Sequence, residues 1–221
     1  FALGILIGLH YRKNPNKNKN IPLIYAAILI DFFEIIKIII CCIRAELGGN
    51  QWYESLLLDL PLFLCSIQLI TLPLAAFTKG RLKEAALDFV LIFGLLGALA
   101  GTFGAAQNFG SYPLICIDNV VSVTTHCISG FGALYIGCSG LGSLKKRNIG
   151  ITFGILFFFC ATAYIVNHII DYNYMFLMAG DGTPYDILFN LVGGSPVWYP
   201  IGVVALFLVY IVAFYGVYYL I

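Results

Sequence analysis

The feature that most constrains this chain is the distribution of its positive charge between long apolar runs. Ten of the twelve Lys and Arg residues lie in three connections, and the alternate connections hold only Arg44. This alternation is the positive-inside pattern of a multi-pass membrane protein, and it predicts orientation as well as location. We therefore expect the three basic connections to face the cytoplasm. They contain Arg12, Lys13, Lys17 and Lys19; Lys79, Arg81 and Lys83; and Lys145, Lys146 and Arg147.

The composition agrees with a chain that lies almost entirely in the membrane. Hydrophobic residues make up 61% of it and charged residues only 10%, whereas about a quarter of a soluble domain is charged. A helical crossing needs about 20 apolar residues, so the 221 residues leave little room for a soluble domain. The basic residues are spread over connections and form no patch, which argues against a nucleic-acid partner.

The apolar runs predict an all-α bundle of about seven transmembrane helices, forming one integral membrane domain over residues 1–221. The first run is short and begins without Met, which indicates a helix that continues before Phe1. With the basic connections inside, the N-terminal end lies outside and the C-terminus inside. The runs are Phe1–Tyr11, Pro22–Ala45, Glu54–Thr78, Ala85–Gly104, Pro113–Leu141, Ile149–Ile170 and Val197–Ile221.

The longest outer connection, Asp171–Pro196, mixes polar and apolar stretches and is interrupted at Gly180-Asp181-Gly182. This pattern indicates either a short interfacial or re-entrant helix or an ordinary loop with an amphipathic turn. In the fourth run, glycines recur about once per helical turn, which predicts a helix packed deep in the bundle. They are Gly94, Gly97, Gly101 and Gly104.

Ionisable residues inside an apolar run are costly in a membrane, so each is a candidate functional residue. The second run places several of them on one helical face, including Glu34 and Lys37, which can pair with each other. The pair is either a structural ion pair that stabilises the bundle or part of a buried ion or proton site. The whole stripe consists of Asp31, Glu34, Lys37, Cys41 and Arg44.

In the third run, Cys65 and Gln68 share a helical face with Pro61, which we expect to weaken or kink the helix. Cys65 then lies near the middle of the membrane. A buried Cys is either a small apolar packing group or, beside a base, a nucleophile. None of the seven cysteines shows the spacing of a zinc site or of a CxxC motif, and neither a metal nor a cofactor is implied.

The fifth run carries His126 at similar depth, on one stripe with Asn119, Ser122 and Ser129. A neutral imidazole is the usual base for a thiol or hydroxyl nucleophile. The alternative is a hydrogen-bonded contact between helices. Small polar groups such as Ser66, Asn119 and Ser122 are candidates for stabilising an oxyanion.

Several motifs resemble a known family. The stretch from Leu60 to Cys65 resembles the Pro-Leu-His-Leu-Cys element of the YwaF-like, or transmembrane protein 164-like, integral membrane family. The helix around His126 resembles that family's helix with a central His. Asn173-Tyr174-Met175 resembles its Asn-Tyr-Met element, and Pro196 and Trp198-Tyr199 follow at similar spacing. The resemblance runs in order over most of the chain.

The eukaryotic branch of this family is described as a lipid acyltransferase, so the resemblance implies that activity, with membrane lipids as partners and no cofactor. We expect the protein to lie in a bacterial plasma membrane. Cys65 would be the nucleophile and His126 the base of a thioester exchange. Phe63 stands where the family has a His, two residues before the Cys. The residues expected to bind substrate or support the site are Glu34, Lys37, Gln68, Asn119, Ser122 and Asn173.

Three functions remain open at this point. The first is a Cys-dependent lipid acyltransferase or lipid hydrolase. The second is a transporter or ligand-binding membrane protein that uses the stripe of Asp31, Glu34 and Lys37, together with His126, as a buried polar site. The third is a non-catalytic membrane scaffold in which the polar groups serve only helix association. No protein partner is inferred.

Overall fold

The computed structural model describes residues 1–103, 113 and 115–220, and these consist of helices and connecting turns, without a strand. The predicted all-α class is therefore confirmed. The chain divides into two compact units, Phe1–Ser143 and Leu144–Ile221. That both units form one membrane domain remains a prediction.

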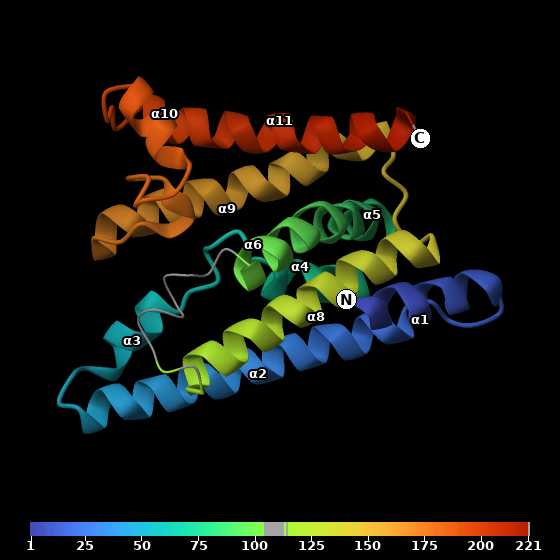
Figure 1. Ribbon diagram of the computed structural model, residues 1–221, viewed down its shortest axis with the longest axis horizontal. Helices are drawn as coiled ribbons and strands as arrows, with labels where there is room; N and C mark the ends of the chain where they lie inside the picture. Colours follow the sequence, from blue (N-terminus) through green and yellow to red (C-terminus); the bar gives the residue numbers. More distant parts are fainter. Residues whose placement is uncertain (104–112, 114, 221) are drawn as a thin grey trace. The chain divides into compact units, whose positions relative to one another are not determined.

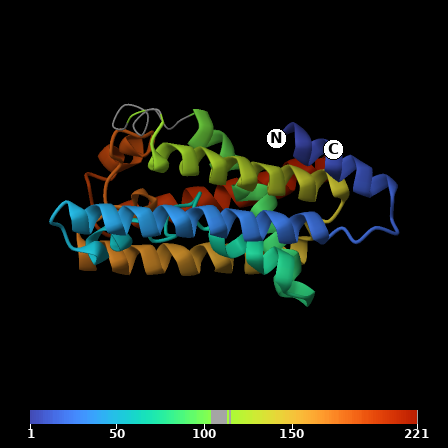
Figure 2. The ribbon, with the colours of Figure 1, turned by 90° about the horizontal axis from the view of Figure 1, so that it is seen from below.

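The first unit is organised around α8 (Ile117–Ser139), which contacts α1, α2, α4, α6 and the π-helical turn η1. Two perpendicular views show α2 and α8 running side by side (Figures 1 and 2). Their shared core is apolar and includes Leu23, Ile30 and Tyr135. The other elements are α1 (Ala2–Lys13), α2 (Ile21–Leu47), α3 (Trp52–Leu58), α4 (Gln68–Phe77), α5 (Gly80–Phe89), η1 (Val90–Gly94) and α6 (Leu95–Phe103).

The third apolar run is not one helix, so the prediction of a continuous span over Glu54–Thr78 is wrong. The helix stops after α3 and resumes at α4, leaving residues 59–67 in turns. Pro61 has no N–H to donate and a restricted φ, and Asp59 is drawn into an ion pair with Lys37 on α2. The sequence predicted a kink at Pro61, and the structure contains a full break.

The fourth run is a continuous helical rod in which η1 joins α5 to α6. The five residues of η1 are a π-helical turn, a feature that often occurs next to functional sites. Gly94, Gly97 and Gly101 follow on this rod, and they lie against neighbouring segments at close range. Gly104 falls outside the residues that the structure describes.

Two of the basic connections meet at one end of the first unit. The Lys19 ammonium donates to the Ser139 carbonyl at 2.7 Å, and the Lys83 ammonium donates to the Asn20 side-chain oxygen at 2.6 Å. Tyr135 closes the same end by donating its hydroxyl to the Lys19 carbonyl at 2.7 Å. The α1–α2 connection, the start of α5 and the C-terminal end of α8 are thereby joined.

The second unit is built on two long helices, α9 (Ile149–Ile170) and α11 (Trp198–Leu220). The bounds of α9 coincide with the predicted sixth run. Between the two helices the chain forms the short helices η3 (Tyr174–Phe176) and α10 (Tyr185–Leu191), so the long connection does contain a short helix. The 3-10 turn η2 (Lys146–Asn148) precedes α9.

Four helices of the described chain are long and apolar enough to cross a membrane. The 27-residue helix α2 is not among them, because its interior carries Asp31, Glu34 and Lys37. The four segments are Gly80–Thr102, Ile117–Ser139, Lys146–Ile170 and Trp198–Leu220.

Candidate functional site

Cys65 lies in the break between α3 and α4, where the backbone is free of regular helical bonding. Cys65 is one of the four turn residues, 64–67, that directly precede α4. The turn is closed by Ile67 N–H donating to the Phe63 carbonyl at 3.0 Å. A thiol in this partly buried position needs a neighbouring base if it is to act as a nucleophile.

Ser66 stabilises the break through its side chain. Its hydroxyl oxygen accepts from the Phe63 N–H at 3.0 Å, and the hydroxyl donates to the Phe63 carbonyl at 3.1 Å. Both backbone groups of Phe63 therefore have a partner that does not depend on a regular helix. The Ser66 hydroxyl, a candidate for oxyanion stabilisation, is instead occupied in supporting the turn.

His126 is oriented by its own helix. Its Nδ1 lies 2.6 Å from the Ser122 carbonyl oxygen and 3.5 Å from the Ser122 hydroxyl. A carbonyl only accepts, so Nδ1 carries the proton and donates. In the neutral ring Nε2 is then the basic nitrogen, which is the state that a general base requires.

Gly97 and Gly101 lie one turn apart on α6 and form its glycine face, against which Cys65 and His126 both lie. A Cβ added to Gly97 would lie 3.3 Å from the Cys65 Cα, and a Cβ added to Gly101 would overlap the His126 ring. Residues four apart on a helix have Cβ positions about 5–6 Å from each other. Cys65 and His126 therefore lie against adjacent turns of one helix face, and only glycine leaves room for both.

A buried charge cluster adjoins this pair. Lys37 Nζ lies 2.6 Å from a Glu34 carboxylate oxygen and 3.0 Å from an Asp59 carboxylate oxygen. Glu34 is 9% exposed, and it is within electrostatic range of both Cys65 and His126. The sequence suggested the Glu34–Lys37 pair but missed Asp59. Asp59 could have been found from its position at the edge of an apolar run, because a carboxylate there needs a positively charged partner.

Gln68 adds a buried polar group beside the same helix. It is 0% exposed, and its Oε1 accepts from the Thr71 hydroxyl at 3.2 Å. Its Nε2 is buried and has no hydrogen-bond partner among the described residues. Its Oε1 would lie 3.4 Å from a Cβ added to Gly94. Gln68 therefore borders this helix one turn before Gly97, and its side-chain amide nitrogen has no hydrogen-bond partner among the described residues.

Two candidate residues have other roles. Asn119 lies at the N-terminal end of α8, where its side-chain N–H donates to the Pro113 carbonyl at 3.0 Å, two helical turns from His126. Asn173 belongs to the second unit, where its side chain donates to Asp181 at 2.6 Å and accepts from the Met178 N–H at 2.8 Å. Asn173 thus organises its own loop.

Sequence reasoning also missed a contact between α2 and α8. The Arg44 guanidinium donates to both carboxylate oxygens of Asp118, at 2.9 and 3.0 Å, and the Cys41 thiol lies 3.4 Å from the same carboxylate. The sequence placed Arg44 and Cys41 on the stripe of α2 but did not identify Asp118 as their partner. Among the described residues, no three His, Cys, Asp or Glu side chains are grouped so that they could hold a metal ion.

Helices of spanning length around a buried cluster of ionisable groups define a multi-pass integral membrane protein. Residues 1–215 match the TMEM164 family, and the chain belongs to that family. The resemblance to transmembrane protein 164-like proteins is thereby confirmed. No curated protein and no solved structure matches the chain.

Proposed function

We propose that this protein is a lipid acyltransferase or lipid hydrolase that forms an acyl thioester on Cys65. The observation that carries this proposal is the pairing across α6. Cys65 lies against Gly97, and the basic His126 lies against Gly101, one turn further along the same helix face. A nucleophile, a base and oxyanion donors are the parts that acyl transfer requires.

In the first half of the reaction, His126 Nε2 takes the thiol proton and the Cys65 thiolate attacks the ester carbonyl of a phospholipid. The oxyanion accepts hydrogen bonds from the N–H groups of Cys65 and Ser66. The ester C–O bond then breaks, and the lysolipid leaves with the proton held by His126. In the second half, a hydroxyl of a second lysolipid, or water, gives its proton to His126, attacks the thioester and regenerates the thiol.

Phe63 stands where the family has a His, and the proposed scheme assigns no step to the side chain at this position. His126 supplies the base, and the contribution of Phe63 is its backbone, which bonds to Ser66. The charge cluster around Lys37 joins α2 to the segment that carries Cys65. We assign it to positioning that segment.

We further propose seven membrane crossings in a bacterial plasma membrane, with the N-terminal end outside and the C-terminus inside. The two basic connections that meet at the Ser139 end of the first unit support this orientation, because positive connections favour the cytoplasmic side. The broken third run counts as one crossing composed of α3, the turns and α4.

Acyl-transfer assays in proteoliposomes test the proposal. We expect Cys65→Ala to abolish transfer between phospholipid and lysolipid, and His126→Asn to reduce it by about 10²–10⁴-fold, the usual contribution of a general base. Cys127→Ala is the matched control, since Cys127 is an exposed cysteine of α8. Full activity in a folded Cys65→Ala protein would eliminate the proposal.

The second candidate function is transport or ligand binding at the buried cluster of Glu34, Lys37 and Asp59, which is favoured by three ionisable groups in one contact network. It predicts solute or proton flux in proteoliposomes that depends on Lys37 and is indifferent to Cys65. A scaffold function predicts neither flux nor acyl transfer, and stability alone would then respond to these substitutions.

A further inference from the structure

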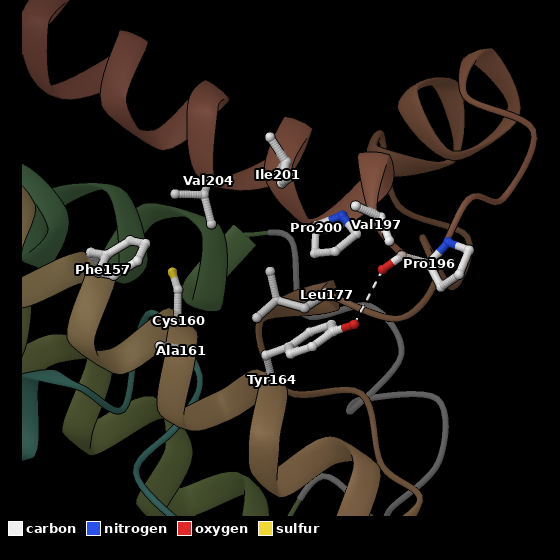
Figure 3. Close-up of a pocket in the computed structure, with 10 residues that line it drawn as sticks. All are labelled: Phe157, Cys160, Ala161, Tyr164, Leu177, Pro196, Val197, Pro200, Ile201 and Val204. Atoms are coloured by element: carbon white, nitrogen blue, oxygen red, sulfur yellow. Dashed lines mark hydrogen bonds between the residues drawn. The ribbon is translucent and has the colours of Figure 1, made fainter.

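The second unit contains a groove between α9 and α11 that the proposed chemistry does not use (Figure 3). Its volume is about 400 Å³, within the size range of small-molecule sites. On α9 the lining extends from Phe157 to Tyr164, a rise of about 10 Å along the helix. On the other wall it extends from Pro196 to Val204.

The lining is apolar along nearly its whole length. Phe157, Ala161, Leu177 and Val204 present hydrocarbon, and Cys160 adds a thiol. The exception lies at the end nearest the long connection, where the Tyr164 hydroxyl donates to the Pro196 carbonyl at 3.2 Å (Figure 3). The groove therefore has one polar end and an apolar remainder.

The wall formed by Leu177 is held in place by the loop behind it. The buried Asn167 side chain accepts from the Tyr174 N–H at 2.7 Å and donates to the Tyr174 carbonyl at 3.0 Å. Met175 and Phe176 both have φ of +56°, a left-handed conformation that is costly outside glycine. The Met175 sulfur lies 3.4 Å from the Cys160 sulfur. Because these contacts hold the loop in a costly conformation, the Leu177 wall of the groove is preformed.

The chemistry and size of the groove select its occupant. A peptide strand would leave its N–H and C=O groups unpaired against these apolar walls. Both walls belong to helices apolar enough to span a membrane, so the surrounding medium supplies hydrocarbon chains at this depth.

We propose that this groove binds one acyl chain of a membrane phospholipid, with the ester end beside Tyr164 and the chain directed toward Phe157 and Val204. Van der Waals contact along the chain favours binding, and the Tyr164 hydroxyl would donate to the ester carbonyl in place of the Pro196 carbonyl. This site is separate from the Cys65 chemistry and does not depend on it.

The test uses the full chain in phosphatidylethanolamine–phosphatidylglycerol vesicles that contain a small fraction of phospholipid with a diazirine in its acyl chain. After illumination, cross-linked peptides are mapped by mass spectrometry. We expect labels concentrated on groove residues of α9 and α11. Ala161→Trp should reduce them to the level found on other lipid-facing positions, while Ile165→Trp, on an exposed part of α9 outside the groove, should not.

Val204→Phe fills the groove from the opposite wall and replaces Ala161→Trp if that variant does not fold. Labels spread evenly over the outer helix surfaces, or unchanged by either filling variant, would overturn the proposal. Stronger groove labelling by a diazirine fatty acid than by the phospholipid would overturn the assignment to a phospholipid chain. Cys65→Ala should leave the groove labels unchanged, which separates this inference from the proposed enzyme activity.

Discussion

The two units of this protein place different chemistry between their long helices. In the first unit the helices enclose an ion cluster, a buried amide and the Cys65–His126 pair. In the second unit the space between α9 and α11 is lined by hydrocarbon with a single polar end. Hydropathy finds helices in both units. The side chains enclosed between them distinguish a region suited to chemistry from one suited to binding a chain.

The units also differ in how they interrupt their helices. The first unit breaks a membrane-depth helix at residues 59–67 and satisfies the exposed backbone with the Ser66 side chain. The second unit keeps α9 and α11 unbroken and places all but one of its positive-φ non-glycine residues in the connection between them; the exception is Leu144, before α9. Irregular backbone at membrane depth is tolerated where protein groups satisfy it, which is typical of a functional segment.

The largest expected effect comes from removing the central cation of the first unit. Lys37→Met leaves the buried Glu34 and the partly buried Asp59 without a counter-charge, which should lower the free energy of unfolding by about 3–5 kcal/mol. Lys146→Met in the second unit should cost about 1 kcal/mol or less, because Lys146 is exposed and loses only a cation–π contact with Tyr219. The measurement is unfolding in mixed micelles.

A triple variant serves as the control for Lys37→Met. Neutralising all three groups, with Glu34→Gln and Asp59→Asn added, should recover most of the loss because no charge is left unpaired. If Lys37→Met and Lys146→Met cost the same, the claim that the two units differ in buried charge fails.

A smaller effect is expected from closing the glycine face. Gly101→Ala adds a Cβ where the His126 ring lies, and overpacking of this kind costs about 1–3 kcal/mol. It should also reduce acyl transfer strongly because the ring must move. Gly154→Ala on α9 meets nothing within 4 Å, and should stabilise by up to about 1 kcal/mol through helix propensity. Activity and unfolding midpoint are measured on both, and equal behaviour would contradict the packing described for α6.

The smallest effect is expected at the ion pair between α2 and α8. Arg44 is 54% exposed on its side chain, and an exposed pair contributes about 0–1 kcal/mol. Arg44→Gln should therefore change the free energy of unfolding by less than about 1 kcal/mol, and less still at high salt. A loss as large as that of Lys37→Met would show that burial does not explain the difference in stability expected between the two ion pairs.

The long helices were predictable from sequence because hydropathy and charge placement are local properties. The run Ile149–Ile170 predicted α9 to the residue, and Val197–Ile221 predicted α11 closely. The same signal failed in the third run. Apolar residues continue across residues 59–67, but backbone continuity there depends on Pro61 and on an ion pair with a helix distant in sequence.

The candidate site was predictable in its parts and not in its arrangement. Cys65 and His126 were identified as residue types that could act together, and their meeting depends on Gly97 and Gly101 lying between them. Sequence spacing cannot show that a third helix supplies the common face. Nor could it show that the Asn119 side chain donates to the Pro113 carbonyl or that Ser66 supports a turn, since both are contacts set by local backbone geometry.

The central claim is that Cys65 carries an acyl group, and the most direct measurement is the intact mass of the protein after incubation with phospholipid. We predict an added mass of one acyl chain that is removed by neutral hydroxylamine, present in the parent and in Cys127→Ala, and absent in Cys65→Ala. An adduct that persists in Cys65→Ala, or acyl transfer that continues in that variant without any adduct, would contradict the thioester mechanism.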